Sequence, residues 1–209
     1  FQEGGSAPVI KIKNIKIGNA SIDEVDYVNA DFFKKLDSKF HVLPGEILIS
    51  LTGSHITQPN SVVGRVGRYP FDYPAALLNQ RAGKVIPDES LVDSSYLFYV
   101  LMDGDLRKKI AQMASGSASQ ANISPSQVES VTVPLPDIEY QKKVGGTLFC
   151  YDNLVENNNR RIAILEEMAQ SLYREWFVKF RYPGHENQKM IESPLGLIPD
   201  GWEVVDTKK

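Results

Sequence analysis

Residues 138–179 constrain the fold of this chain more than any other stretch. Apolar side chains recur there in alternating steps of four and three, without a slip, for more than four heptads. The seam consists of Val144, Leu148, Tyr151, Val155, Asn158, Ile162, Leu165, Ala169, Leu172 and Trp176, of which nine are apolar. An α-helix of about 42 residues would be roughly 60 Å long and would carry one narrow apolar stripe. The spacing therefore predicts a long coiled-coil helix that requires a partner helix.

The residues at both ends of this stretch agree with a helix. Pro134 and Pro136 disfavour a helix upstream, and Asp137 offers a side chain for the N-cap. Pro183 and Gly184 are typical of the residues that follow a helix end.

Inside the predicted helix, three residues leave alternatives open. Asn158 is either a tolerated polar residue at a splayed point of the coil or a device that fixes register and partner orientation. Gly145 and Gly146 weaken a helix by roughly 1 kcal/mol each relative to Ala. Either the seam is loosest at these glycines, or the backbone of the partner helix comes close to them.

Length and composition place the chain among ordinary globular proteins. Its 209 residues, 42% hydrophobic and 23% charged, fit one compact domain plus the long helix. No apolar run reaches the roughly 18 residues of a membrane span, so we expect no membrane partner. One cysteine, Cys150, rules out an internal disulfide and suits a reducing cytoplasm. We interpret it as a small buried hydrophobic residue rather than a nucleophile.

Charge gives weak support for nucleic-acid binding. The net charge is −3, yet residues 61–86 contain four basic side chains and one acid. Such a local basic face suits a DNA reader that works within an assembly, and it also suits a solvated surface.

The residues before the long helix predict an α+β domain, because strands and helices are interspersed without regular alternation. Strands are expected at residues 8–16, 23–29, 46–52, 61–69, 75–86 and 131–135. Helices are expected at residues 30–36, with Phe32 and Phe33 turned inward, and at 94–102 and 106–113. Residues 53–60 and 114–122 are expected to be loops, and Ser124 begins a short turn or helix.

Several segments contain the polar side chains that read base edges in DNA. The candidates are Lys11, Lys13 and Asn14; Thr52, Ser54, His55, Gln58 and Asn60; Asn79, Gln80 and Arg81; and Ser115, Ser117, Gln120 and Asn122. Gly116 would let the backbone approach a phosphate. The alternative for each is an ordinary hydrogen-bonding surface loop, and residues 79–81 could instead stabilise the fold.

Catalytic motifs are missing from the sequence. It has no Asn-Pro-Pro-aromatic methyltransferase motif and no glycine-rich phosphate loop, and His41, His55 and His185 lack neighbours at metal-ligand spacing. We therefore predict a protein without cofactor or metal that positions enzymes made by other chains.

Four pieces of the sequence, in order, resemble the specificity subunit of type I restriction–modification systems. They are residues 44–50 (PGEILIS); residues 78–81 (LNQR); the Gly116-Ser117 loop leading to Ile123-Ser124 and residues 133–136; and the helix end at residues 175–177, followed by residues 196–199 and 201–204. The combination is specific, although each motif alone is weak.

This resemblance implies a target recognition domain at residues 1–136, a spacer helix at 137–182, and a tail at 183–209 that opens a second repeat. It also implies double-stranded DNA, methyltransferase subunits and a restriction or translocase subunit as partners. The family pairs its spacers antiparallel and usually has two recognition domains, whereas this sequence has one. The chain is thus a half-subunit, a permuted form or a fragment. We expect it to pair with itself, antiparallel, through the seam. The alternative is a coiled-coil dimerisation protein whose globular head binds another protein.

Overall fold

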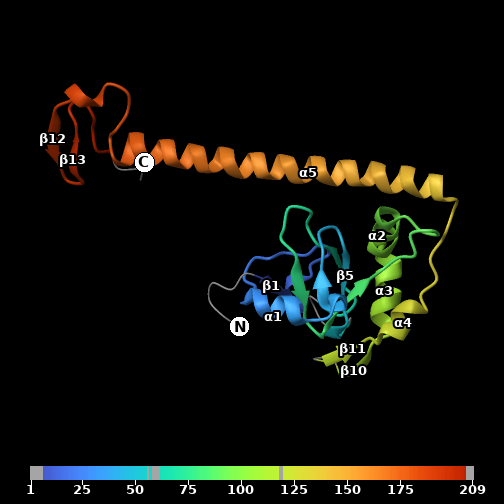
Figure 1. Cartoon of the computed structure of the whole chain (residues 1–209). Helices are drawn as coiled ribbons and strands as arrows, with labels where there is room; N and C mark the ends of the chain where they lie inside the picture. Colours follow the sequence, from blue (N-terminus) through green and yellow to red (C-terminus); the bar gives the residue numbers. More distant parts are fainter. Residues whose placement is uncertain (1–6, 56, 58–61, 118–119, 206–209) are drawn as a thin grey trace. The chain divides into compact units, whose positions relative to one another are not determined.

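The computed structural model describes residues 7–55, 57, 62–117 and 120–205 (Figure 1). The chain forms two compact units, Phe1–Phe149 and Cys150–Lys209. The first unit combines short strands with helices α1 to α4 and the first turns of the long helix α5. This combination confirms the predicted α+β class.

Within the described residues, two four-stranded sheets form the body of the first unit. Their strand orders are β3-β1-β8-β4 and β2-β7-β5-β9, with parallel pairing between β1 and β8 and between β2 and β7. The first sheet contains β1 (Ala7–Ile10), β3 (Asp26–Val28), β4 (His41–Val42) and β8 (Ala76–Leu78). The second contains β2 (Gly18–Asn19), β5 (Ile47–Ser50), β7 (Val66–Arg68) and β9 (Ala82–Val85). A third, small sheet has the order β10-β11-β6, with β6 (Thr52–Gly53), β10 (Ser115–Ser117) and β11 (Gln120–Asn122).

Strand β5 connects the two hydrophobic clusters of the core. Ile47 and Ile49 belong to the cluster that includes α2 and α3, whereas Leu48 belongs to the cluster around Ile10 and Tyr69. Successive side chains of a strand point to opposite faces, so β5 is buried on both sides. Burial on both sides explains why its sequence is a continuous apolar run rather than an alternating one.

The helices of the first unit begin at side-chain caps. They are α1 (Ala30–Lys35), α2 (Ser94–Met102), α3 (Gly104–Gln112) and α4 (Pro125–Glu129), with 3-10 turns η1 (Ile12–Asn14) and η2 (Ser38–Phe40). Asp93 accepts a hydrogen bond from the Tyr96 amide at 2.8 Å, and Asp103 accepts two from the first turn of α3. Ser124 and Gln127 form a capping box at α4. Of the two alternatives expected after Ser124, a short turn or a short helix, the structure shows the helix.

Three predicted strands need correction. The strand expected at residues 8–16 ends at Ile10, and residues 12–14 form the 3-10 turn η1. Residues 75–86 form two strands, β8 and β9, because Asn79 accepts a hydrogen bond from the Arg81 amide and turns the chain between them. Residues 131–135 are not a strand. Pro134 has no amide hydrogen to donate to a neighbouring strand, and Val131 and Val133 instead pack against the core cluster.

Two further predictions need correction. Residues 114–122 were expected to be a loop, yet β10 and β11 pair antiparallel within them. Phe32 is 49% exposed, whereas Phe33 stacks on His41 with ring centroids 4.2 Å apart. Adjacent helix residues point in directions about 100° apart, so a helix can turn one ring inward and leave the next exposed.

Helix α5 (Ile138–Tyr173) is the long helix that the seam predicts. Asp137 caps it by accepting a hydrogen bond from the Tyr140 amide at 2.9 Å. The buried side chain of Gln141 then joins α5 to the first unit, accepting from the Asp93 amide at 2.9 Å and donating to the Leu91 and Pro136 carbonyls. A buried amide whose donor and acceptor groups are bonded stabilises this junction.

Two residues further along α5 lie on the same face, at spacings of four. Gly145 is buried, and a Cβ atom there would lie 2.6 Å from the Tyr96 nitrogen at the start of α2. Phe149 contacts the Phe71 ring edge-on, with centroids 5.2 Å apart, and the Arg68 guanidinium lies 5.5 Å from its centroid. The sequence suggested a partner helix as the backbone that comes close to Gly145, whereas the structure shows α2 of the same chain there.

In the second unit, the chain leaves α5 through a π-helical turn, η3 (Arg174–Val178). The Trp202 ring contacts Phe177, Phe180 and Tyr182, with centroids 6.0, 5.4 and 6.5 Å away. The hairpin of β12 (Met190–Ser193) and β13 (Gly196–Pro199) follows the 3-10 turn η4 (His185–Asn187). The aromatic contacts therefore join the residues after α5 to the tail.

Candidate nucleic-acid interface

Three of the predicted DNA-reading segments meet around Leu51. The Leu51 amide donates to the Arg81 carbonyl at 3.0 Å, and the Leu51 carbonyl accepts from the Ile123 amide at 2.8 Å. One residue further, Thr52 pairs with Asn122 in the β6–β11 ladder. The fold thus brings residues 52–55, 79–81, 115–117 and 120–122 to one place in the first unit, although these segments are far apart in the sequence.

The β10–β11 hairpin presents polar side chains to solvent. Ser115, Gln120 and Asn122 are exposed, whereas Ala121 between them is fully buried in the core. Gly116 has a φ of 128° and lies so close to the facing strand that an added Cβ would be 2.3 Å from the Gln120 carbonyl oxygen. The alternation on β11 fixes which of its side chains can reach a ligand.

In the polar segment after β6, Ser54 and His55 are half-buried and Thr57 is exposed. Ser54 accepts a hydrogen bond from the Val62 amide at 3.2 Å, and His55 Nδ1 lies 3.1 Å from the Thr57 hydroxyl. Gln58 and Asn60 lie outside the described residues. Ser54 and His55 therefore help to shape the segment in addition to any contact with DNA.

The turn between β8 and β9 divides into a structural and an exposed part. Asn79 is half-buried, and its side chain accepts from the Arg81 amide at 3.2 Å. Gln80 and Arg81 are exposed. Asn79 thus stabilises the turn, and the side chains of the two following residues are available to a ligand.

The first predicted cluster also has internal contacts. Lys11 donates a hydrogen bond to Asp26, which holds the pKa of that carboxyl below its ordinary value. Asn14 is 3% exposed and bonds the Lys11 amide and the Asp23 carbonyl. Lys13 is exposed. A buried side chain cannot read DNA, so we leave Asn14 out of the candidate interface.

Two basic residues that the motif search did not single out lie on α3. Arg107 and Lys108 line a cavity beside the segment that carries Val63 and Arg65. The available signal was the run Arg107-Lys108-Lys109 in an otherwise neutral domain. A basic run within a helix is common, so this signal is weak without the cavity.

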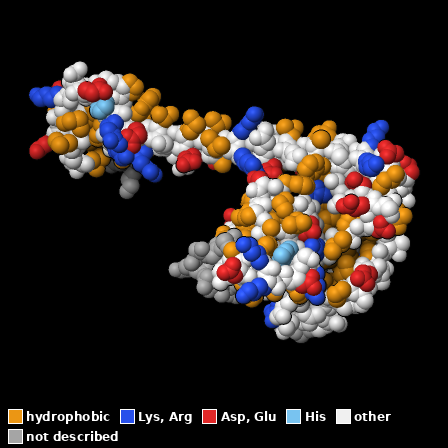
Figure 2. All heavy atoms as spheres, viewed as in Figure 1, with side chains coloured by type: hydrophobic (Ala, Val, Ile, Leu, Met, Phe, Trp, Pro, Cys, Tyr) orange, Lys and Arg blue, Asp and Glu red, His pale blue; other side chains and the backbone are white. Residues whose placement is uncertain are grey.

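The seam of α5 forms a second candidate surface. Every residue from 150 to 174 is exposed, and the exposed fractions of Tyr151, Val155 and Leu165 are 64%, 58% and 63%. Figure 2 shows hydrophobic side chains at intervals along this helix. Cys150 is exposed rather than buried as expected. Nothing in the described part of the chain covers the stripe.

The seam begins later than the heptads suggest. Val144 is half-buried and packs against the core cluster of the first unit. Leu148, whose side chain is 39% exposed, is the first exposed residue of the seam. The first seam position therefore contributes to the junction between α5 and the first unit.

Neither a metal cluster nor a membrane helix is found in the ranges that the structure describes. No group of three or more His, Cys, Asp or Glu side chains there could hold a metal ion. No helix in the same ranges is both long and apolar enough to cross a membrane.

Known proteins with similar sequences come from restriction systems. The type I restriction enzyme MjaIX specificity subunit of Methanocaldococcus jannaschii is 27% identical over 214 residues, covering 96% of this chain and 47% of that protein. The type I restriction enzyme HindI specificity subunit of Haemophilus influenzae is 28% identical over 165 residues, covering 76% of this chain and 35% of that protein. The chain thus spans less than half the length of these relatives.

A solved structure and a family model agree with these relatives. The fold is similar to that of the type I restriction–modification system S subunit from M. genitalium, with a TM-score of 0.58 and 16% identity, covering 90% of this chain and 45% of that one. The model of the type I restriction modification DNA specificity domain matches residues 1–167. Because that match extends over well more than half of the sequence, the chain belongs to the family of type I restriction modification DNA specificity domains.

Proposed function

We propose that this chain is a DNA-reading part of a type I restriction–modification specificity subunit. The observation that carries the proposal is the meeting of three polar segments around Leu51, where the β5–β9 sheet edge adjoins the small β6–β11 sheet. A rigid sheet that positions exposed amide, hydroxyl and guanidinium groups can match the hydrogen-bond pattern of base edges. In this proposal the exposed residues Gln80, Arg81, Gln120 and Asn122 face one half of a split DNA site.

The proposal assigns catalysis to other chains. The recognition domain at residues 1–136 and the spacer helix at 137–182 would position methyltransferase subunits and a restriction subunit on the DNA, and residues 183–209 would open the next repeat. The relatives carry the name of specificity subunits, which supports this division of labour. We also propose that the chain acts in the cytoplasm, because its substrate there would be cellular DNA.

We further propose that α5 pairs antiparallel with a second copy of the chain. The support is an apolar stripe that the described chain leaves exposed from Tyr151 onward. Apolar area of this extent is stabilised by burial at roughly 25 cal/mol per Å². Two identical readers related by a two-fold axis would recognise a palindromic site with a gap, and the helix length would set that gap.

A gel-shift comparison tests the function. The purified chain, alone and with a methyltransferase subunit, is mixed with a pool of duplexes, and the retained DNA is sequenced. We expect enrichment of one sequence when both proteins are present. A chain that self-associates but enriches no sequence would contradict the DNA-reading function and would favour the coiled-coil scaffold.

Arg81→Ala and Gln120→Ala should each weaken binding to the enriched site by roughly 1–3 kcal/mol, because each removes a side chain that can contact a base or phosphate. Both residues are exposed, so the unfolding midpoint should stay unchanged. The measurement is a binding isotherm for the complex at several salt concentrations.

Lys35→Ala is the matched control for these two variants. Lys35 is an exposed basic residue at the end of α1, outside the three meeting segments. The Lys35→Ala variant should bind the enriched site with the affinity of the parent. If the Arg81 and Gln120 variants also bind like the parent, these two residues do not belong to the interface.

A further inference from the structure

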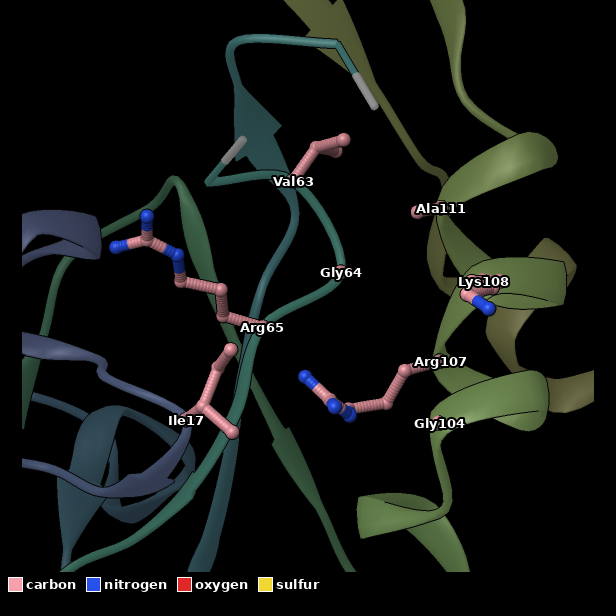
Figure 3. A pocket seen from close by; sticks show the side chains of 8 residues that line it. All are labelled: Ile17, Val63, Gly64, Arg65, Gly104, Arg107, Lys108 and Ala111. Carbon is pink, nitrogen blue, oxygen red and sulfur yellow. The ribbon is translucent and has the colours of Figure 1, made fainter. Parts of the chain in front are cut away.

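A cavity of about 250 Å³ lies between α3 and the segment that leads into β7 (Figure 3). Its apolar walls come from both sides, and its polar groups are basic. Its lining includes Ile17, Val63 and Ala111 together with Arg65, Arg107 and Lys108. Gly64, with a φ of 76°, brings the segment so close to α3 that an added Cβ would lie 3.4 Å from Ala111. None of the described residues that line the cavity is acidic.

Arg107 is the residue best placed to bind an anion in this cavity. Its Nε donates to the Met102 carbonyl at 3.1 Å, which holds the base of the guanidinium in place. Its terminal nitrogens point from α3 into the space beside Ile17, whereas the Arg65 guanidinium points away from α3 (Figure 3). A fixed guanidinium offers two parallel N–H donors, the geometry that suits phosphate oxygens.

Lys108 adds a second positive charge at the rim. Its Nζ lies 3.7 Å from Asp105, and both side chains are more than two-thirds exposed. An ion pair between exposed side chains contributes little in water, so a phosphate of the DNA backbone can replace this partner.

Both walls of the cavity lead directly into the proposed base-reading segments. Val63 and Gly64 follow the polar segment that begins at Ser54, and α3 ends at Gln112, three residues before β10 starts at Ser115. A phosphate held between the walls would therefore fix the position of both reading segments on the duplex. Phosphate contacts set register and orientation in this way, whereas base contacts set sequence.

We propose that this cavity is an anchor for a backbone phosphate of duplex DNA, with Arg107 as the principal ligand and Lys108 as the second. The apolar wall of Ile17, Val63 and Ala111 would contact the adjoining deoxyribose. The inference deepens the proposed function and rests on it, because it concerns the same DNA. It predicts an effect that does not depend on DNA sequence.

The test uses the full chain and a short fluorescent duplex of arbitrary sequence, with anisotropy measured between about 50 and 200 mM salt. Arg107→Ala and Lys108→Ala should each lower affinity roughly fivefold to tenfold and reduce the slope of log affinity against log salt by about 1. Lys109→Ala is the matched control, since Lys109 is exposed on the same helix and does not line the cavity. It should change affinity less than twofold. Lys108→Ala guards against misfolding, because this side chain is 69% exposed.

The outcomes separate the anchor from the DNA-reading function. Parent-like affinity and salt slope in both cavity variants would overturn the anchor and leave the selection of a sequence from a duplex pool intact. Loss of affinity in both variants from a parent that selects no sequence would support the anchor and overturn the reading function. Equal losses of affinity in the Arg107, Lys108 and Lys109 variants would also overturn the anchor. So would the absence of DNA binding by the parent at low salt.

Discussion

Leu165→Glu should convert a self-paired chain into a monomer. Leu165 lies at the centre of the exposed stripe, and pairing would bury it in both copies. Each substitution removes roughly 1.5–3 kcal/mol of apolar burial and adds a carboxylate that loses its water. With two copies per dimer, association should weaken at least about a hundredfold. Sedimentation at micromolar concentration measures this loss directly.

Ile164→Glu is the matched control for that variant. Ile164 is adjacent, apolar and 56% exposed, but it occupies an outer heptad position about 100° away from Leu165 on the helix. The Ile164→Glu substitution should leave the dimer intact and the helix content of the protein unchanged. A monomeric parent would contradict self-pairing, and the partner of the stripe would then be a helix from another chain or another repeat.

Gly145→Ala and Gly146→Ala should change stability in opposite directions. At Gly145 the new Cβ would lie 2.6 Å from the Tyr96 nitrogen and 2.9 Å from Asp93 Oδ1, which are backbone and capping atoms that cannot move freely. Overpacking costs about 1–3 kcal/mol and also strains the hydrogen bonds of Gln141 nearby. At Gly146 nothing lies within 4 Å, so only the helix preference for Ala remains.

Urea unfolding followed by circular dichroism measures both effects. Gly146→Ala should stabilise the first unit by up to about 1 kcal/mol. Gly145→Ala should destabilise it despite the same gain in helix preference, and Gly145→Val should destabilise it more. Equal shifts for the two alanine variants would show that α5 does not dock on α2 through Gly145.

The junction between α5 and the first unit illustrates why some contacts cannot be predicted from the sequence. Gln141 and Gly145 look unremarkable in the sequence, one polar and one helix-weakening. Their roles appear only when residues 91–96, some fifty positions away, come to lie against them, as with the Asp93 amide on Gln141. Periodicity describes a helix face but not what covers it.

In the candidate interface, too, the residue types could be predicted from the sequence and their contacts could not. Residue type alone identified the polar segments, because few side chains can read base edges. That they meet depends on strand pairing between Leu51, Arg81 and Ile123, which no local pattern encodes. The burial of Asn14 likewise follows from the turn that its own side chain bonds.

Local sequence patterns were sufficient to predict the long helix, its cap at Asp137, a turn or helix after Ser124 and the apolar stripe. These features depend on spacings of three and four residues and on local hydrogen bonds, so they are readable in order along the chain. The pairing of β10 with β11, and the absence of a strand at residues 131–135, depend instead on contacts between distant parts of the chain. A strand exists only where a second backbone supplies the missing hydrogen bonds, and that backbone comes from elsewhere in the chain.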